Sequence, residues 1–320
     1  MGIIENQEHS PKDSLHRFIL NSNTVIIKQV TLGERLRGAY LGPEGTFSEE
    51  VAYQMNNRQA DLLHVASNTA VVEAVDRGEF DLGFVAFENS TEGTVIQTLK
   101  AIIHSDLNIL GEKTIPIKQN LFGTPEAKLK GIVNSHPQAF AQSAKWLGEN
   151  IPGYLTQQVN STAEGVRLAK EKDEMGIGTM RAGEIYNIPL LQEGIEDNKL
   201  NFTRFWLIGK GETRPTGNDR TWIALTLKNE AGALKRVIDP FAERKISINK
   251  IDTPPLTMDH YYFFIAIDGH QNDFHVAKSI EEARKACWEL KPIGSFEKSI
   301  LPTVQYEPLA YEKGWIPNGE

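Results

Sequence analysis

One pattern of hydrophobic and polar positions recurs between residues 38 and 210. A short apolar run ends in a turn of Gly, Asn, Ser or Thr, and an amphipathic segment with helical period follows the turn. The apolar runs lie at 38–41, 82–87, 131–133, 154–159 and 175–178, and the helical segments reach Met55, Ile103, Leu147, Lys170 and Ile185. Strands that alternate with helices in this way predict α/β layers with mostly parallel strands.

The turns themselves carry helix-start signals. Each of three pairs matches the capping box, in which Ser or Thr precedes Glu or Gln by three positions: Thr46 with Glu49, Ser135 with Gln138, and Ser161 with Glu164. The free N–H groups and the positive dipole end of a helix N-terminus favour anions. Ligands of open α/β sheets bind beyond the carboxyl ends of the strands, so we expect these turns to meet around a small molecule that carries carboxylates.

The order of predicted strands and helices changes after residues 211–219, a turn-rich linker. The pattern then predicts strands at 221–227, 247–251, 261–267 and 293–296, a helix that opens at 231–234, and a helix over 276–290. This is the β-α-β-β-α-β order of a ferredoxin-like α+β unit. Pro240 lies within the first of its helices and is expected to kink or shorten it.

The pattern therefore divides the chain into four parts. An N-terminal extension, 1–37, contains an apolar run at 25–27 and receives no function. The α/β domain covers 38–210, the smaller domain covers 219–300, and residues 301–320 form a C-terminal tail.

Composition narrows the class of protein. The 320 residues are 40% hydrophobic, which permits a packed core, and the 34 basic and 42 acidic residues give a net charge of −8, which argues against a nucleic-acid partner. The single Cys287 excludes an internal disulfide and fits a reducing compartment. We see neither an apolar run of roughly 18 residues, as a membrane span needs, nor a secretion signal. We expect a cytoplasmic protein with no membrane partner.

The most informative short segment is Thr203-Arg204-Phe205, which enters the apolar run 205–208. A buried strand needs neither a hydroxyl nor a guanidinium at its start, whereas a site that donates hydrogen bonds to an anion does. Residues 42–49 and 88–95 have the same chemical character, with glycines, hydroxyls and amides next to glutamates. No histidine or cysteine spacing fits a metal site, and no nucleotide-binding glycine motif is present, so we expect no cofactor.

These segments resemble those of prephenate dehydratase with a C-terminal ACT domain, a resemblance that covers roughly 38–300. The similarity lies in five motifs in order: 42–49, 88–95, 135–139, 161–164 and 201–205. It implies a fold like the type II periplasmic binding proteins, with one lobe from 38–115 and about 196–210, a second from 116–195, and the active site between them.

The resemblance also implies an activity. Members convert prephenate to phenylpyruvate with loss of CO₂ and water, in phenylalanine biosynthesis, without metal or redox cofactor. It implies catalytic roles for Thr203, Glu88 and Asn89. The implied substrate-binding residues are Thr46, Ser90, Gly93, Ser135, Ser161, Thr162, Arg204 and Phe205.

Several of these residues have a structural alternative. Thr203 acts as a positioned donor or relay at the departing hydroxyl, or is only a strand former. Arg204 binds a substrate carboxylate through two hydrogen bonds, or forms a salt bridge between lobes. Glu88 and Glu92 are candidate acids, although capping is favoured for Glu92. His136 is favoured as a turn residue over a proton donor.

The smaller domain resembles an ACT domain and implies L-phenylalanine as a possible effector. The implied effector residues are Gly232, Ala233, Leu234, Asn249 and Asp252. Where the family usually has Glu-Ser-Arg-Pro, residues 252–255 read Asp-Thr-Pro-Pro. Pro254 in place of Arg removes five donors, so regulation by phenylalanine stays open.

Two other classes of function remain as alternatives. One is a relative that uses arogenate, or that decarboxylates prephenate without losing the hydroxyl. The other is a two-lobed small-molecule sensor that does not catalyse. Because ACT domains pair across chains, the resemblance also implies a homodimer or homotetramer.

Overall fold

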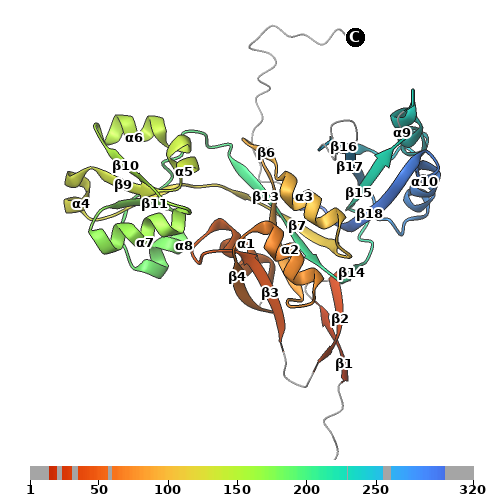
Figure 1. The fold of residues 1–320 in the computed structure, drawn as a ribbon, viewed down its shortest axis with the longest axis horizontal. Helices are drawn as coiled ribbons and strands as arrows, with labels where there is room; N and C mark the ends of the chain where they lie inside the picture. Colours follow the sequence, from red (N-terminus) through yellow and green to blue (C-terminus); the bar gives the residue numbers. More distant parts are fainter. Residues whose placement is uncertain are drawn as a thin grey trace, which may run out of the picture.

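Three bodies lie in a row in the computed structural model (Figure 1), which describes residues 14–19, 24–30, 35–56, 60–228, 230–254 and 261–299. A central lobe carries α1 to α3, an outer lobe carries α4 to α8, and a C-terminal unit with α9 and α10 lies on the opposite side of the central lobe. No helix within these ranges is long and apolar enough to cross a membrane.

The central lobe is built on a six-stranded sheet with the order β4-β3-β5-β13-β7, in which β6 pairs with β5. Its strands are β3 (Leu36–Leu41), β4 (Ala60–Val65), β5 (Leu82–Asn89), β6 (Gly93–Thr94), β7 (Asn108–Pro116) and β13 (Phe202–Gly209). Its helices are α1 (Phe47–Asn56), α2 (Asn68–Asp76) and α3 (Ile96–Ile103).

The outer lobe has a five-stranded sheet with the order β10-β9-β11-β8-β12. Its strands are β8 (Asn120–Phe122), β9 (Ile132–Ser135), β10 (Leu155–Gln158), β11 (Met175–Gly178) and β12 (Leu190–Gln192). Its helices are α4 (Pro125–Lys130), α5 (Pro137–Gln142), α6 (Ala144–Asn150), α7 (Thr162–Lys172) and α8 (Met180–Tyr186).

The two sheets are mixed, so the expectation of mostly parallel strands is wrong. β3 runs parallel to β4 and β5, and β9 runs parallel to β10 and β11. β13 is antiparallel to β5 and β7, and β8 is antiparallel to β11 and β12. The cause is the double crossing of the chain, from β7 to β8 and back from β12 to β13. The returning strand β13 enters its sheet beside the carboxyl end of β5.

The C-terminal unit has the β-α-β-β-α-β order that the sequence predicts. Its four strands are antiparallel, with the order β16-β17-β15-β18. They are β15 (Asp219–Leu227), β16 (Ile248–Asp252), β17 (Tyr262–Asp268) and β18 (Cys287–Glu297), and the helices are α9 (Ala233–Glu243) and α10 (Phe274–Arg284).

Two expectations for this unit need correction. Pro240 does not shorten α9, which continues to Glu243 with Val237 and Phe241 of its apolar face fully buried. α10 ends at Arg284, and residues 287–290 already belong to β18. Their apolar positions continue the helical period of α10, but pairing with β15 gives their backbone a sheet partner instead.

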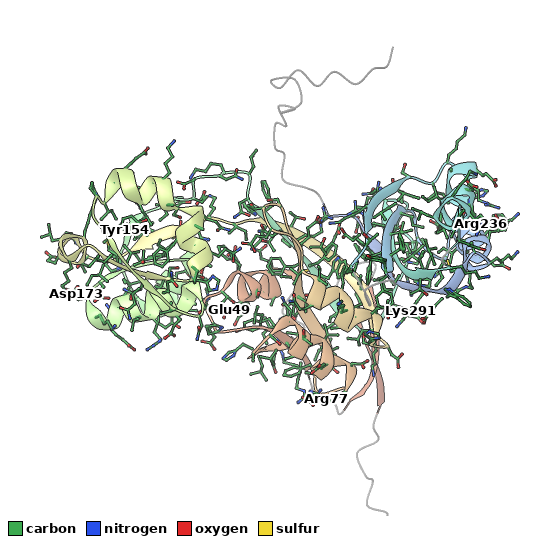
Figure 2. All side chains as sticks on the ribbon, turned by 45° about the horizontal axis from the view of Figure 1, so that its top comes forward. Glu49, Arg77, Tyr154, Asp173, Arg236 and Lys291 are labelled. Carbon is green, nitrogen blue, oxygen red and sulfur yellow. The ribbon has the colours of Figure 1, made fainter. Side chains whose placement is uncertain are left out.

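One core joins the C-terminal unit to the central lobe. Trp206 of β13 stacks on Phe87 of β5, with ring centroids 3.8 Å apart, and Trp222 of β15 meets Trp206 edge-on at 5.3 Å. All three side chains are fully buried. Figure 2 shows Lys291 at this junction, where its ammonium donates to the carbonyl of Ser105. The two bodies therefore meet through a packed apolar interface.

The N-terminal extension contains a β-hairpin. β1 (Ser14–Ile19) pairs with β2 (Thr24–Val30), and β2 pairs with β14 (Glu212–Thr213). β14 lies within the segment expected to be a turn-rich linker. The predicted tail, 301–320, lies outside the described residues.

Candidate active site

A cavity of about 1120 Å³ opens between the central and outer lobes. The central lobe lines it with the ends of β3 and β5, the start of α1 and the start of β13, and the outer lobe lines it with the starts of α5 and α7. Of the eleven catalytic and substrate-binding residues that the resemblance implies, the structure brings six to this cavity: Thr46, Asn89, Ser161, Thr162, Thr203 and Phe205. Glu92, a candidate acid, and His136 line it too.

Thr203 and Asn89 form the polar centre of the cavity wall. They are opposite one another in the β13–β5 ladder, and both side chains are more than 90% buried. Asn89 Nδ2 donates to the Thr203 hydroxyl and to the side-chain Oδ1 of Asn201, each at 2.9 Å. Asn89 Oδ1 accepts the backbone N–H groups of Thr91 (2.9 Å) and Glu92 (3.1 Å).

These contacts fix the direction of the hydrogen bond between Asn89 and the Thr203 hydroxyl. Because Asn89 Oδ1 already accepts two N–H groups, its amide cannot flip, and Nδ2 must face Thr203. The Thr203 oxygen is therefore an acceptor toward Asn89. Its own hydrogen has no acceptor among the described residues, so the hydroxyl can donate into the cavity.

Helix N-termini supply the remaining polarity. Ser161 Oγ accepts the N–H of Glu164 at 3.0 Å and caps α7, and Thr46 Oγ1 accepts the N–H of Glu49 at 3.3 Å before α1. The first N–H groups of each helix have no acceptor within the helix. Two such ends from different lobes therefore face one cavity with unpaired donors.

The third expected capping box is wrong. The cap of α5 is His136, whose Nδ1 accepts the N–H of Gln138 at 3.2 Å. Ser135 is fully buried on β9 and donates to the carbonyl of Ile177 at 2.8 Å, away from the cavity. The turn role favoured for His136 agrees with this geometry, and its ring also lines the cavity.

Glu88 and Arg204 do not line the cavity, in contrast to the roles expected for them. Successive side chains of a strand point to opposite faces, so these neighbours of Asn89 and Thr203 face the C-terminal unit. Arg204 Nη1 lies 3.2 Å from Glu88 Oε2, and its Nε lies 3.9 Å from Glu112. Arg204 therefore forms salt bridges, as the structural alternative expected, but its partners belong to the same lobe and not to the other one.

Ser90 and Gly93 also lie outside the cavity. Ser90 donates to the carbonyl of Leu200 (3.0 Å) and accepts the N–H of Phe202 (2.9 Å), which fastens the end of β5 to the start of β13. Gly93 has φ +82°, the left-handed region that favours glycine, in the β5–β6 turn. Both residues shape the loop that carries Asn89.

The structure places the expected effector residues at the start of α9 and on β16. Gly232 precedes α9 with φ +79°, and Ala233 and Leu234 form its first turn. Asn249 is exposed on β16, whereas Asp252 lies on the other face of that strand and accepts the Thr94 hydroxyl at 3.0 Å.

His64 and Gln119 are among the cavity residues that sequence reasoning missed. His64 ends β4, a strand that the pattern did not reveal, and Gln119 lies on the crossing between lobes. Gln119 is 2% exposed; its side-chain Nε2 donates to Gln142 at 2.9 Å, while its side-chain Oε1 has no partner within the described ranges.

Direct bonds hold the lobes together at the cavity rim. Thr179 donates to the carbonyl of Gly45 at 2.6 Å, and the Gln138 amide donates to Glu92 at 2.5 Å. Figure 2 shows Glu49 where the two lobes meet, and Arg181 of the outer lobe lies 3.9 Å from it. Gly45 has φ +84°, and a Cβ there would lie 3.0 Å from Ala182 Cα, so a side chain at this position would be strained.

Comparison with known proteins gives a consistent result. The family model for prephenate dehydratase matches residues 39–213. The chain is 32% identical over 282 residues to the bifunctional chorismate mutase/prephenate dehydratase of Aquifex aeolicus, with coverage of 87% of this chain and 78% of the relative. It is also 32% identical over 277 residues to the prephenate dehydratase of Lactococcus lactis subsp. cremoris, with coverage of 83% and 99%.

A solved structure shares the arrangement. The prephenate dehydratase of Arthrobacter aurescens, crystallised in complex with L-Phe, superposes with a TM-score of 0.75 at 29% identity and covers 82% of this chain and 90% of that one. The motifs, the cavity between two lobes and these matches together show that the chain belongs to the prephenate dehydratase family.

Proposed function

We propose that this chain converts prephenate to phenylpyruvate in the cavity between its lobes, with the Thr203 hydroxyl as the donor to the leaving hydroxyl. The observation that carries the assignment is the fixed hydrogen-bond direction at Thr203, whose oxygen accepts from Asn89 at 2.9 Å. Its hydrogen is thereby available to a ligand in the cavity.

The reaction requires little more than placement and charge stabilisation. The bond between the ring and its carboxylate breaks, and its electron pair enters the ring. The C–O bond at the para carbon, which carries the hydroxyl, breaks as well. The hydroxyl leaves as water with one proton from solvent, and CO₂ leaves, so that the dianion becomes a monoanion. A hydrogen bond aimed at the departing oxygen stabilises the negative charge that develops there.

The carboxylates of prephenate need partners in the cavity. Among the described residues, no Lys or Arg lines it. We assign the carboxylates to the N-termini of α1 and α7, marked by Thr46 and Ser161, because unpaired N–H groups and the helix dipole favour anions. Phe205 and Ile117 supply apolar wall against the ring. We assign Glu88 and Arg204 to the support of this wall.

The test is turnover by the purified protein. We expect prephenate to yield phenylpyruvate without added metal or nucleotide, as identified by mass spectrometry. Thr203→Val removes the hydroxyl at nearly constant volume and is expected to lower kcat by at least 100-fold, whereas Thr203→Ser retains the donor and most of the rate. Equal rates for Thr203→Val and wild type would overturn the role of Thr203.

Parallel reactions separate the alternatives. Arogenate given to the same enzyme should react with a lower kcat/KM than prephenate. A product that retains the hydroxyl would indicate a decarboxylase. Ligand-induced stabilisation without any product would indicate a sensor.

We also propose that the C-terminal unit is an ACT-type regulatory domain that responds to L-phenylalanine and pairs with a second copy. Support comes from its β-α-β-β-α-β order, from Gly232 at the start of α9, and from the L-Phe complex of the Arthrobacter aurescens relative. Exposed Phe274 and Trp288 offer apolar surface for pairing. We place this biosynthetic activity in the cytoplasm.

Calorimetry with L-phenylalanine tests the regulatory assignment. Pro254 lacks the guanidinium that the family usually has at this position, so we expect weak binding to wild type and tighter binding to Pro254→Arg. Tight binding by the wild type would show that this arginine is not needed. Light scattering would give the oligomeric state.

A further inference from the structure

Six alternating charges form a chain behind the Thr203–Asn89 pair, on the face of the sheet opposite the cavity. In order of contact they are Asp252, Lys250, Glu88, Arg204, Glu112 and Arg220. Glu88, Arg204 and Glu112 belong to the central lobe, and the other three belong to the C-terminal unit.

We infer that Lys250 and Arg220 are positioning residues for catalysis, which hold Asn89 and Thr203 in place through Glu88 and Arg204. The inference rests on the proposed function of Thr203. It assigns to the C-terminal unit a part in building the active site itself, in the absence of any effector.

The charged chain is linked to Asn89 and Thr203 because one of its members is the sequence neighbour of each. Glu88 precedes Asn89 on β5, Arg204 follows Thr203 on β13, and the two charged residues face one another in the ladder. Lys250 forms an ion pair with Glu88. On the other side, Arg220 Nη1 lies 2.9 Å from Glu112, which in turn lies 3.9 Å from Arg204.

A second contact reaches the loop that fixes the Asn89 amide. Lys250 donates to the Thr94 hydroxyl at 3.2 Å, and Thr94 donates to Asp252 at 3.0 Å. Thr94 pairs with Glu88 in the β5–β6 turn. That turn contains the N–H groups of Thr91 and Glu92, which hold Asn89 Oδ1.

Burial makes these ion pairs effective constraints. Side-chain exposure is 1% for Glu112, 15% for Arg220, 18% for Arg204, 21% for Lys250 and 25% for Glu88. Water screens such charges poorly, and three positive charges balance three negative ones. Removal of Lys250 takes the ion-pair partner from Asp252 and leaves Glu88 with Arg204 alone, and the strand ends that carry them must then adjust. A misplacement of about 1 Å in a catalytic group can cost 100-fold in rate.

Lys250→Met tests the inference, with Lys250→Arg as the rescue. Lys235→Met is the matched control, because Lys235 belongs to the same unit but is 77% exposed and, among the described residues, forms an ion pair with Asp239 alone. We expect Lys250→Met to lower kcat about tenfold and to change KM less than twofold, because the helix N-termini that bind the carboxylates are untouched. Lys250→Arg should recover at least half the rate, and Lys235→Met should match wild type.

Thr94→Val is a milder second variant that buries no unpaired charge and is expected to remain folded. We expect it to lower kcat about threefold, with KM again steady. A folded Lys250→Met or Thr94→Val enzyme with wild-type kcat would overturn the inference, as would a change confined to KM. If wild type itself fails to dehydrate prephenate, the proposed function fails instead, so the two failures are distinguishable.

Discussion

Asn89→Asp is the sharpest test of the hydrogen-bond direction at the centre of the cavity. The change replaces one NH₂ with oxygen at nearly constant shape. The new side chain still accepts the N–H groups of Thr91 and Glu92, but it can no longer donate to Thr203 across the 2.9 Å contact. Thr203 must then direct its single hydrogen at the carboxylate, and the donor to the leaving hydroxyl is lost.

The magnitude follows from that single lost donor. Loss of one preorganised donor to a developing oxyanion costs about 3 kcal/mol, and each 1.36 kcal/mol is tenfold in rate. We therefore expect kcat to fall by about 100-fold. The new charge also faces a dianion, so KM should rise. The other hydrogen bond of the Asn89 amide is to Asn201. In the variant the Asn201 amide can turn, so that its Nδ2, which has no partner among the described residues, donates to the new carboxylate.

The assay is the rate of phenylpyruvate formation, with thermal unfolding as the check on folding. Asn89→Ala is the matched comparison, because it removes the donor to Thr203 without adding an acceptor that captures the hydroxyl. We expect Asn89→Asp to be slower in kcat than Asn89→Ala. The reasoning is refuted if Asn89→Asp keeps kcat within twofold of wild type, or if Asn89→Ala is the slower variant while both remain folded.

Two further predictions concern substrate binding and stability. Ser161→Ala should raise KM for prephenate severalfold and cost about 1 kcal/mol of stability. The control Thr124→Ala removes the 3.0 Å cap of α4 outside the cavity, and it should cost similar stability and leave KM unchanged. Steady-state kinetics and urea unfolding measure both effects, and equal KM values in the two variants would count against the carboxylate assignment. His270 is fully buried between Thr213 and Asn272, and burial lowers its pKa from 6.5. The unfolded chain then binds the proton at higher pH than the folded protein, so the contribution of His270 to stability is complete above pH about 6.5 and is lost as pH falls toward the folded pKa. Urea unfolding of wild type and His270→Gln from pH 8 to 5 should show a smaller loss in the variant, and identical pH slopes would contradict this account.

The sequence predicted the elements whose apolar runs and caps lie close together in the chain. The starts of α1 and α7 followed from hydroxyl caps at Thr46 and Ser161, because a cap is a local interaction between residues three apart. The β-α-β-β-α-β order was predictable for a similar reason, except near Cys287. There the apolar residues fit a helix and a strand equally, and only the distant partner β15 decides between them.

The division of the site residues between two faces of the sheet could not be predicted in the same way. Thr203 and Arg204 are neighbours, yet one faces the cavity and the other faces the C-terminal unit. Alternation along a strand predicts that they separate, but which side holds the cavity depends on the packing of Trp206 against Trp222. The strand direction of β13 likewise depends on the return from the outer lobe, a long-range event that no local pattern encodes.

The packed rings of Phe87, Trp206 and Trp222 determine where this chain can be truncated. A fragment that ends at residue 210 would keep every cavity residue but would present the indole of Trp206 and the phenyl ring of Phe87 to water. Truncation at residue 210 would thus expose an apolar surface behind an otherwise complete active site, and such a surface favours aggregation. The central lobe and the C-terminal unit are separate in sequence, but they share one hydrophobic core. We therefore expect both to unfold in a single transition.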